Sequence, residues 1–267
     1  MEKGGFGLDA AGLSTAGILI ALLVVGVGLW EQARPDHPER EPAGPRWIAN
    51  IVLFAIGDGA WLVVAPLLSY GATWLGVVEA QGGIGLHFLL MLPLLDAGDY
   101  ALHRLSHRVG WLWRLHAIHH TDTEIDVTTT LRHHPAEVLV VGFAFAGIGM
   151  LIGAAPEEMV AYGVLAFAVQ LVAHANVALP PALERVLSLV VVTPPFHRFH
   201  HSRDQRQSDA NYGQVLVIWD RLLGTLAPRD GRDAPAAFGV EAFLAPRFRT
   251  IAGMLLQPLA ATIPPAR

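Results

Sequence analysis

The stretch that decides the fold runs from Asp99 to Pro135, DYALHRLSHRVGWLWRLHAIHHTDTEIDVTTTLRHHP. It contains seven of the thirteen histidines in the chain. Two motifs within it have helical spacing, i, i+4 for the first and i, i+3, i+4 for the second: His103 and His107, and His116, His119 and His120. Because residues three and four apart share a helix face, each motif can direct two or three imidazoles at one spot.

The same spacing recurs later in the chain at His197, His200 and His201, in PPFHRFHHS, and His174 stands between the clusters in VAHAN. Neutral imidazole is a common metal ligand that suits iron, zinc, copper and nickel. A single His-x-x-x-His pair would fit a histidine-rich surface, but this repeated pattern does not. Since one metal takes roughly four to six ligands, the sequence predicts two metal ions.

Composition indicates a membrane protein. Of the 267 residues, 53% are hydrophobic and only 15% are charged, against about 25% charged in soluble domains. The chain has no cysteine, so disulfides, iron–sulfur clusters and thiolate ligands are excluded, and nitrogen and oxygen must hold the metals. The formal charge of −5 argues against a nucleic-acid partner.

Apolar runs predict several membrane-spanning helices. The candidates are Leu13–Trp30, Trp47–Tyr70, Ile84–Leu102, Glu137–Ala154 and Glu157–Ala175. The first run could instead be a signal peptide, but its long apolar core and the absence of a clear cleavage site favour a transmembrane helix. The last two form a transmembrane hairpin over residues 137–175. Shorter apolar segments at Leu183–Val192 and Ile251–Ile263 are expected at the membrane interface.

We therefore expect an all-α fold, a polytopic membrane bundle of about four to five spanning helices with a dinuclear metal site on its cytosolic side. The expected domains are an N-terminal transmembrane part at 1–92, a catalytic domain at 93–228 and a C-terminal tail with an interfacial helix at 229–267. Arginines are absent from the connector 71–83 and from the hairpin turn, and they gather on the other side with the histidines. By the positive-inside rule that side is cytoplasmic, in the inner membrane of a bacterium.

At these residues the chain resembles the fatty acid hydroxylase/sterol desaturase superfamily of membrane di-iron oxygenases. The matching pieces, in the order of that family, are HRLSH, LWRLHAIHHTD, TTTLRHHPAE, QLVAHANV, VTPPFHRFHHSRD, SDANYGQVL and WDRLLGT, between about Asp96 and Leu226. The resemblance implies O2-dependent hydroxylation or desaturation of a lipid, such as a sterol-like, fatty acyl or carotenoid substrate. It implies two iron ions, with O2 as co-substrate and electrons from a separate ferredoxin- or cytochrome-type donor with its reductase. It further implies that a cytosolic, histidine-rich helical cap holds the dinuclear metal site.

Carried over by position, the resemblance implies these metal ligands: His103, His107, His116, His119, His120, His174, His197, His200 and His201. His134 in RHHP is expected as a tenth ligand, and its neighbour His133 as a structural residue. The chain departs from the family pattern at Tyr100-Ala101, where many members have an aromatic pair. It also has Gln170 where some members have a further histidine, which leaves one metal with one nitrogen fewer, or with water.

Metal-bound histidines usually donate their second ring N–H to a carboxylate or carbonyl. The carboxylates near the motifs are Asp96, Asp99, Asp122, Asp126, Glu137 and Asp220. Asp99 is the favoured partner because it lies four residues before His103, on the same helical face. Asn176 is a further candidate polar member of the active site, and Asp99 and Asn176 are the two catalytic candidates outside the ligand set.

Two other functions fit the same histidines. A membrane hydrolase would hold zinc in this cage, although no His-Glu-x-x-His motif supplies the usual general base. A metal transporter or other non-enzymatic metal-binding protein would need ligands near the bilayer midplane, whereas these histidines fall at the ends of the predicted spans and beyond. Zinc can also displace iron during overexpression, so zinc in a purified sample would not exclude the oxygenase.

Overall fold

The computed structural model describes residues 10–38, 43–74, 85–229, 231 and 234–260. Within these ranges all regular elements are helices, and the only β pairings are three isolated bridges. The prediction of an all-α fold is therefore confirmed.

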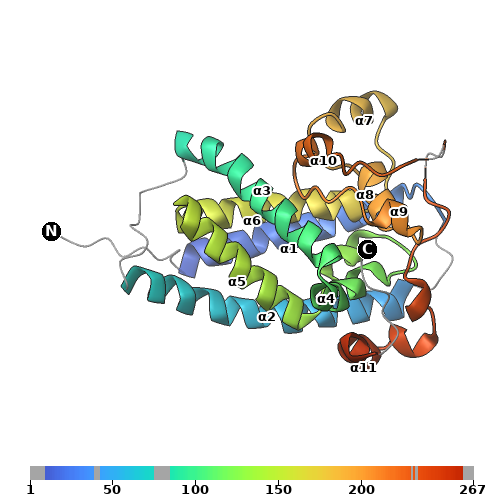
Figure 1. Ribbon diagram of the computed structural model, residues 1–267, viewed down its shortest axis with the longest axis horizontal. Coiled ribbons are helices and arrows are strands. Elements are labelled where there is room, and N and C mark those ends of the chain that lie inside the picture. The colour runs from blue at the N-terminus through green and yellow to red at the C-terminus, as the bar shows by residue number, and fades with distance from the viewer. Residues whose placement is uncertain (1–9, 39–42, 75–84, 230, 232–233, 261–267) are drawn as a thin grey trace.

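Five long helices run side by side along the long axis of the molecule (Figure 1). They are α1 (Ala10–Ala33), α2 (Ala43–Trp74), α3 (Leu86–Arg108), α5 (Pro135–Ile152) and α6 (Pro156–His174). Three segments among the described residues are long and apolar enough to cross a membrane: Ala43–Ala65 within α2, all of α5 and all of α6. This count is lower than the predicted four to five. Helix α3 does not qualify because Asp96, Asp99 and its histidines lower its hydropathy.

Shorter helices form a cap at one end of the bundle (Figure 1). In chain order they are α4 (Gly110–His120), the 3-10 helix η1 (Val127–Leu131), α7 (Pro181–Leu187), α8 (Pro194–His200), α9 (Gln205–Ser208) and α10 (Ile218–Leu223). The chain then forms the 3-10 helices η2 (Glu241–Phe243) and η3 (Pro246–Arg249), the helix α11 (Ile251–Leu256) and the 3-10 helix η4 (Gln257–Leu259). Both segments expected at the interface contain only short helices, α7 in the first and α11 with η4 in the second. Residues 261–263 of the second lie outside the described ranges.

Local sequence explains how the central hairpin forms. Helix α5 starts at Pro135, whose fixed φ suits the first helical position and whose missing N–H is not needed there. It ends at Gly153, which has φ 73° and so occupies the left-handed region that favours glycine. Gly142 lets α5 approach α2, because a Cβ atom there would lie 2.8 Å from the Trp61 ring. The hairpin and α2 therefore pack closely.

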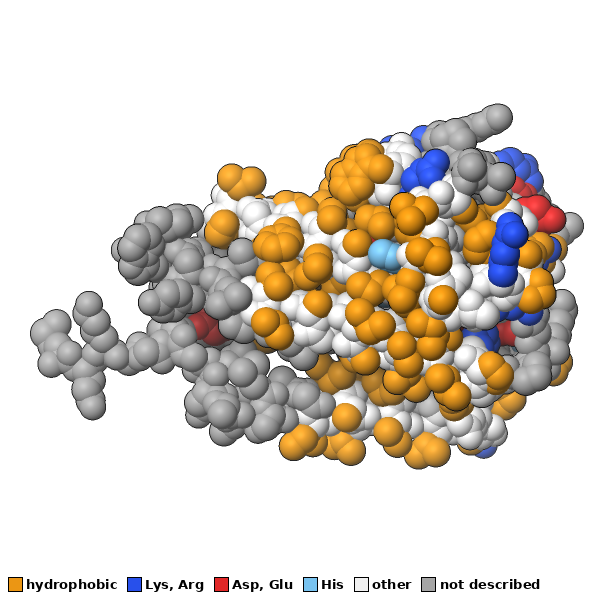
Figure 2. All heavy atoms as spheres, turned by 90° about the horizontal axis from the view of Figure 1, so that it is seen from below, with side chains coloured by type: hydrophobic (Ala, Val, Ile, Leu, Met, Phe, Trp, Pro, Cys, Tyr) orange, Lys and Arg blue, Asp and Glu red, His pale blue; other side chains and the backbone are white. Residues whose placement is uncertain are grey.

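The surface of the bundle is apolar and the cap end is charged. Leu22, Val63 and Leu151 on three of the long helices are 63%, 67% and 88% exposed, which suits helices whose surroundings are hydrocarbon. Figure 2 shows hydrophobic side chains spread over the helices on one face, with Lys and Arg side chains gathered at the cap end. The buried core continues into the cap, where Ala173 of α6 packs with Phe196 and Val217.

Candidate metal centre

Nine buried histidines meet where the long helices enter the cap, and they form two groups. The five-histidine group consists of His103, His107, His116, His120 and His200. The four-histidine group consists of His119, His174, His197 and His201. Within each group one ligand atom per residue lies within 4.8 Å of all the others. These are the nine histidines that the sequence motifs predict as ligands, and each group can hold one metal ion.

The grouping follows helix geometry. Each i, i+4 pair stays together: His103 with His107, His116 with His120, and His197 with His201. The remaining histidine of each three-histidine motif crosses to the other group, as His119 and His200 do. Positions i+3 and i+4 lie about 100° apart around a helix, because an α-helix has 3.6 residues per turn. One motif therefore supplies ligands to both groups. The sequence predicted that two or three imidazoles of a motif share one spot, and the structure shows that two do so while the third joins the other group.

Backbone carbonyls fix several of these rings through Nδ1. The Nδ1–H groups of His103, His174 and His200 donate to the carbonyl oxygens of Tyr212, Gln170 and Ala210, at 2.8, 2.8 and 2.7 Å. His119 donates to the carbonyl of Arg132 at 3.3 Å. Because a carbonyl only accepts, each of these neutral rings carries its lone pair on Nε2. That tautomer directs Nε2 at the centre of the group.

Carboxylates orient two further rings of the five-histidine group. Glu137 Oε1 accepts from Nδ1 of His116 at 2.5 Å, and the carboxylate is buried. Asp209 Oδ1 lies 3.4 Å from Nδ1 of His107. Such partners fix the tautomer of a metal-bound histidine and raise its basicity.

The nitrogen atoms at the centre of each group fit a cation. His119 and His174 both direct Nε2 lone pairs at one another across 3.1 Å, an arrangement that a shared metal ion would stabilise. The Nε2 atoms of His107 and His200 are buried and have no hydrogen-bond partner among the described residues. Burial lowers the pKa of His200 to about 3 and lowers the pKa of five further ligand histidines, so these rings are neutral and able to ligate near pH 7: His107, His119, His120, His197 and His201.

A small cavity of about 50 Å³ touches both groups. Five ligand histidines line it: His103, His116, His119, His174 and His197. The other lining residues are Thr130, His133, Gln170 and Gln214. Motif spacing does not indicate Thr130 or Gln214, because neither belongs to a metal-binding pattern.

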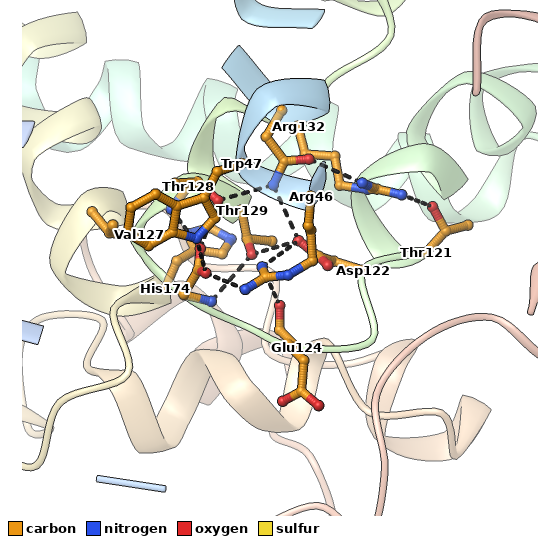
Figure 3. Close-up of polar contacts among 12 residues, drawn as sticks. Arg46, Trp47, Thr121, Asp122, Glu124, Val127, Thr128, Thr129, Arg132 and His174 are labelled. Carbon is orange, nitrogen blue, oxygen red and sulfur yellow. Dashed lines mark hydrogen bonds and ion pairs between the residues drawn. The ribbon is translucent and has the colours of Figure 1, made fainter. Parts of the chain in front are cut away.

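A buried polar network ties the second histidine motif to α2 (Figure 3). Arg46 near the start of α2 forms ion pairs with Asp122 and Asp126. The Arg132 guanidinium donates to the Asn50 side chain at 2.9 Å and to the carbonyl of Ile118 at 2.9 Å. Since the Arg132 carbonyl accepts from His119, this network holds one ligand of the four-histidine group.

Two buried carboxylates hold the segment between α9 and α10. Asp96 accepts from the backbone N–H groups of Val215 and Leu216, both at 3.1 Å. Asp220 accepts from the N–H groups of Tyr212 and Gly213 at 2.9 and 2.8 Å. The segment 212–216 carries both the carbonyl that orients His103 and the cavity residue Gln214, so these carboxylates act at the metal centre through the backbone.

The structure does not bring His134 into either group. Its Nδ1 accepts from the N–H of Ala136 at 3.1 Å and so caps α5, while its Nε2 lies 3.2 Å from the carbonyl oxygen of Leu255. Both ring nitrogens are thereby engaged away from the centre. Its neighbour His133, expected to be structural, instead stacks on His119 with ring centroids 4.4 Å apart and approaches Glu137. Of the two adjacent histidines, His133 therefore lies nearer the nine grouped histidines.

The two catalytic candidates outside the ligand set also lie elsewhere. The Asp99 carboxylate accepts from the Tyr162 hydroxyl at 3.0 Å rather than from His103. The Asn176 side chain donates to the carbonyl of His37 at 2.7 Å and accepts from its N–H at 3.0 Å. Asn176 therefore ties the segment after α1 to the cap, while the carboxylate that contacts a ligand histidine most closely is Glu137.

Comparison with known proteins places the chain in a family. The fatty acid hydroxylase family matches residues 88–225, which is more than half of the chain and includes all nine grouped histidines. The chain therefore belongs to the fatty acid hydroxylase family, and its three long apolar helices make it an integral membrane protein.

Several curated proteins are similar to this chain. Ornithine lipid hydroxylase OlsE of Rhizobium tropici is 35% identical over 176 residues, which are 64% of this chain and 51% of that protein. Alkylglycerol monooxygenase of Danio rerio is 30% identical over 139 residues, 51% of this chain and 30% of that protein. A cholesterol 25-hydroxylase-like protein of Danio rerio is 31% identical over 137 residues, 51% of this chain and 53% of that protein.

This chain thus spans about half or less of the length of these curated relatives. No solved structure gives a significant match to it.

Proposed function

We propose that the protein is a di-iron oxygenase that hydroxylates or desaturates a membrane lipid with O2. The observation that carries the proposal is the pair of buried histidine groups at the end of apolar helices, with Nε2 atoms directed inward. An all-nitrogen, neutral ligand set suits iron, zinc and copper. The family and the relatives named for lipid hydroxylation and alkylglycerol monooxygenation favour oxygen chemistry among the functions that this set allows.

Iron bound in the two groups would supply the O2 reduction and C–H oxidation. In hydroxylation one C–H bond breaks, one oxygen atom joins that carbon, and the other leaves as water with two external electrons and two protons. In desaturation two C–H bonds break and both oxygen atoms leave as water, again with two external electrons and two protons. The electrons come from a separate ferredoxin- or cytochrome-type protein, since no flavin or dinucleotide motif is evident in the sequence.

The residues of this chain would bind the metals, they orient the ligand rings, and they exclude water from the centre. Nine histidines would hold the two metals. Glu137 and the Tyr212 carbonyl fix the orientation of His116 and His103, and the α2 network fixes that of His119. Burial of these side chains keeps bulk water from the centre. The lipid approaches from the bilayer, and the concentration of arginine beside the histidines supports a cytoplasmic position for the centre. The membrane we propose is the inner membrane of a bacterium.

Metal content tests the proposal first. Protein purified in detergent from iron-supplemented cells is expected to contain about two metal ions per chain, one for each histidine group. Zinc that has displaced iron is removed and replaced with ferrous iron under anaerobic conditions before assay. The reconstituted protein, given 18O2 and a reduced ferredoxin, is expected to yield an 18O-labelled lipid or a new alkene. Absence of bound metal, or loaded protein that changes no lipid, would contradict the proposal.

A further inference from the structure

Two short helices of the cap, α7 and α10, expose apolar side chains. Eight large apolar side chains on these helices and just after them are between 45% and 68% exposed: Leu183, Val186, Leu189, Val190, Ile218, Leu222, Leu223 and Leu226. We call these eight residues the α7–α10 patch. Soluble proteins rarely expose an apolar patch larger than a few hundred Å², and larger ones mark contact with a membrane or with another protein.

The acidic side chains of the same helices point into the protein. Glu184 of α7 accepts a hydrogen bond from the Thr193 hydroxyl at 2.8 Å. Asp220 of α10 is buried and accepts from the backbone N–H groups of Tyr212 and Gly213. A helix on a water-exposed surface has the opposite arrangement, with its apolar face inward and its polar face outward. The reversed arrangement indicates that the surroundings of both helices are apolar.

Hydrogen bonds join the two helices into one unit. The N–H of Val217, just before α10, donates to the carbonyl of Val190 at 3.0 Å. The Arg221 guanidinium of α10 donates to the carbonyl of Ser188, which directly follows α7, at 2.9 Å. The exposed side chains of α7 and α10 therefore belong to one surface.

This unit lies where a membrane-spanning helix ends. Val217 packs with Ala173, the last residue but one of α6, and α6 is long and apolar enough to cross a membrane. The Trp219 indole of α10 donates to Asp96 of α3 at 2.8 Å. In Figure 1, α7 and α10 project sideways from the cap at this end of the bundle. The patch is therefore at the level of the membrane surface.

A second exposed apolar segment lies on the opposite side of the bundle. Leu256 and Leu259, in α11 and η4, are 62% and 79% exposed. Their neighbour Met254 packs with Ala49, near the start of the α2 span, and Figure 1 shows α11 across the bundle from α7 and α10. Two apolar segments on opposite sides, both near the ends of spans, fit one continuous lipid leaflet. A protein bound on one side would leave the other segment uncovered.

We propose that the α7–α10 patch inserts into the lipid leaflet at the cap end of the bundle, with its side chains among the first acyl carbons. Arg185 and Arg221, exposed on the same two helices, then lie at the level of the lipid phosphates, which guanidinium groups bind. Apolar runs of the sequence indicate only the α7 half of this surface, because α10 contains Asp220 and Arg221 among its six residues.

Insertion of the patch fixes the depth of the metal centre. Asp220 of α10 holds the N–H of Tyr212, and the Tyr212 carbonyl orients His103. The nine histidines then lie at the level of the lipid headgroups. This surface needs only the membrane location of the chain and goes beyond the proposed function, so its test does not use activity.

Fluorescence quenching measures the depth of the patch. Because the chain has no cysteine, a single introduced cysteine in the full chain carries one NBD label. Val186→Cys and Leu222→Cys test the patch, Gln205→Cys on the exposed surface of α9 is the control for water, and Val63→Cys on α2 is the control for lipid. Each protein is reconstituted in vesicles of phosphatidylcholine and phosphatidylglycerol, and quenched by a nitroxide on the lipid acyl chain or by aqueous iodide.

The two quenchers decide the location of the patch. We expect the lipid nitroxide to quench the labels of Val186→Cys and Leu222→Cys roughly threefold or more strongly than that of Gln205→Cys, and iodide to quench them correspondingly less. Iodide quenching equal to that of Gln205→Cys would overturn the proposal. Labels shielded from both quenchers would overturn it as well, because a second copy of the chain would then cover the patch.

Photolabelling of the unsubstituted protein gives an independent measurement. The vesicles then contain a phospholipid with a diazirine on one of the first acyl carbons, and mass spectrometry locates the crosslinks after irradiation. Crosslinks are expected in residues 181–190 and 218–226 and not in residues 203–208, which belong to the exposed part of the cap around α9. Their absence from both α7 and α10 would overturn the proposal, even if a cysteine variant failed to fold.

Discussion

The five-histidine and four-histidine groups lie side by side but are built differently. In the first, carbonyls or carboxylates contact Nδ1 of four of the five rings: His103, His107, His116 and His200. In the second, only His119 and His174 have such partners, while Nδ1 of His197 and His201 is buried without one among the described residues. Three of the four rings in the second group line the cavity, against two of five in the first. In the five-histidine group most ligand rings are therefore fixed by hydrogen-bond partners, whereas in the four-histidine group most ligand rings face the small cavity.

The largest effect is expected from His119→Ala, which removes one of only four ligands. Activity should fall below detection and bound metal should decrease by about one ion per chain, because the group keeps only three of its four histidine ligands. Elemental analysis of membrane-extracted protein measures the loss. His37→Ala, in the exposed loop after α1, is the control, and unchanged metal content in His119→Ala would remove His119 from the site.

Graded chelation should distinguish the two groups in the wild-type protein. Each lost orienting partner costs roughly 10–100-fold in metal affinity, so the four-histidine group is expected to release its metal first, at chelator concentrations about tenfold lower or more. Metal retained per chain is measured after equilibration over a chelator series. A single release step for both ions would contradict the comparison.

Glu137→Gln should weaken the firmly held group selectively. It removes the charge opposite His116 while keeping the size of the side chain, so the affinity of the five-histidine group is expected to fall by roughly 10–100-fold. In the same chelator series, the five-histidine group would then release its metal at a lower chelator concentration, closer to that of the four-histidine group. The control is Glu157→Gln, at the far end of α6 from His174. Equal weakening of both groups would mean that Glu137 supports the fold in general rather than His116.

The smallest effect is expected from His134→Ala. Loss of the cap on α5 should lower the free energy of unfolding by about 1 kcal/mol, with both metal ions retained. Thermal unfolding in detergent and elemental analysis measure the two quantities on one sample. A variant that lost a metal ion would restore His134 as the tenth ligand that its place in the sequence predicts.

The ligand set is the part of the site that sequence predicts best, because a metal ligand motif depends on local helix geometry. His116 and His120 share a face wherever their helix lies. Glu137 was one of six nearby carboxylates, and spacing favoured Asp99, since both Asp99 and His103 lie on α3. The choice between them depends on how α4 packs against α5, which brings Glu137 to His116 across 21 positions of sequence. Spacing along one helix contains no information about that packing.

The same reasoning explains His133 and His134. Neighbouring residues at the start of a helix point in different directions, and the one that caps the helix is decided by backbone geometry at Pro135. Sequence alone could not decide which of the two faces the centre. Two residues of the cavity wall, Thr130 and Gln214, were likewise not predictable, because they come from separate segments and belong to no shared pattern. Gln170 was indicated by the family resemblance, since some members have a histidine at its position.

By itself, the sequence determined an all-helical membrane protein without thiolate ligands and with nine histidines placed to bind metal. Composition decides the first of these properties, and helical periodicity decides the last. Only the tertiary structure decided how the nine histidines divide into groups of five and four, which partners orient them, and that a small cavity borders both groups. These features arise where α3, α4, α6 and α8 meet, and contacts between distant segments depend on packing rather than on local spacing.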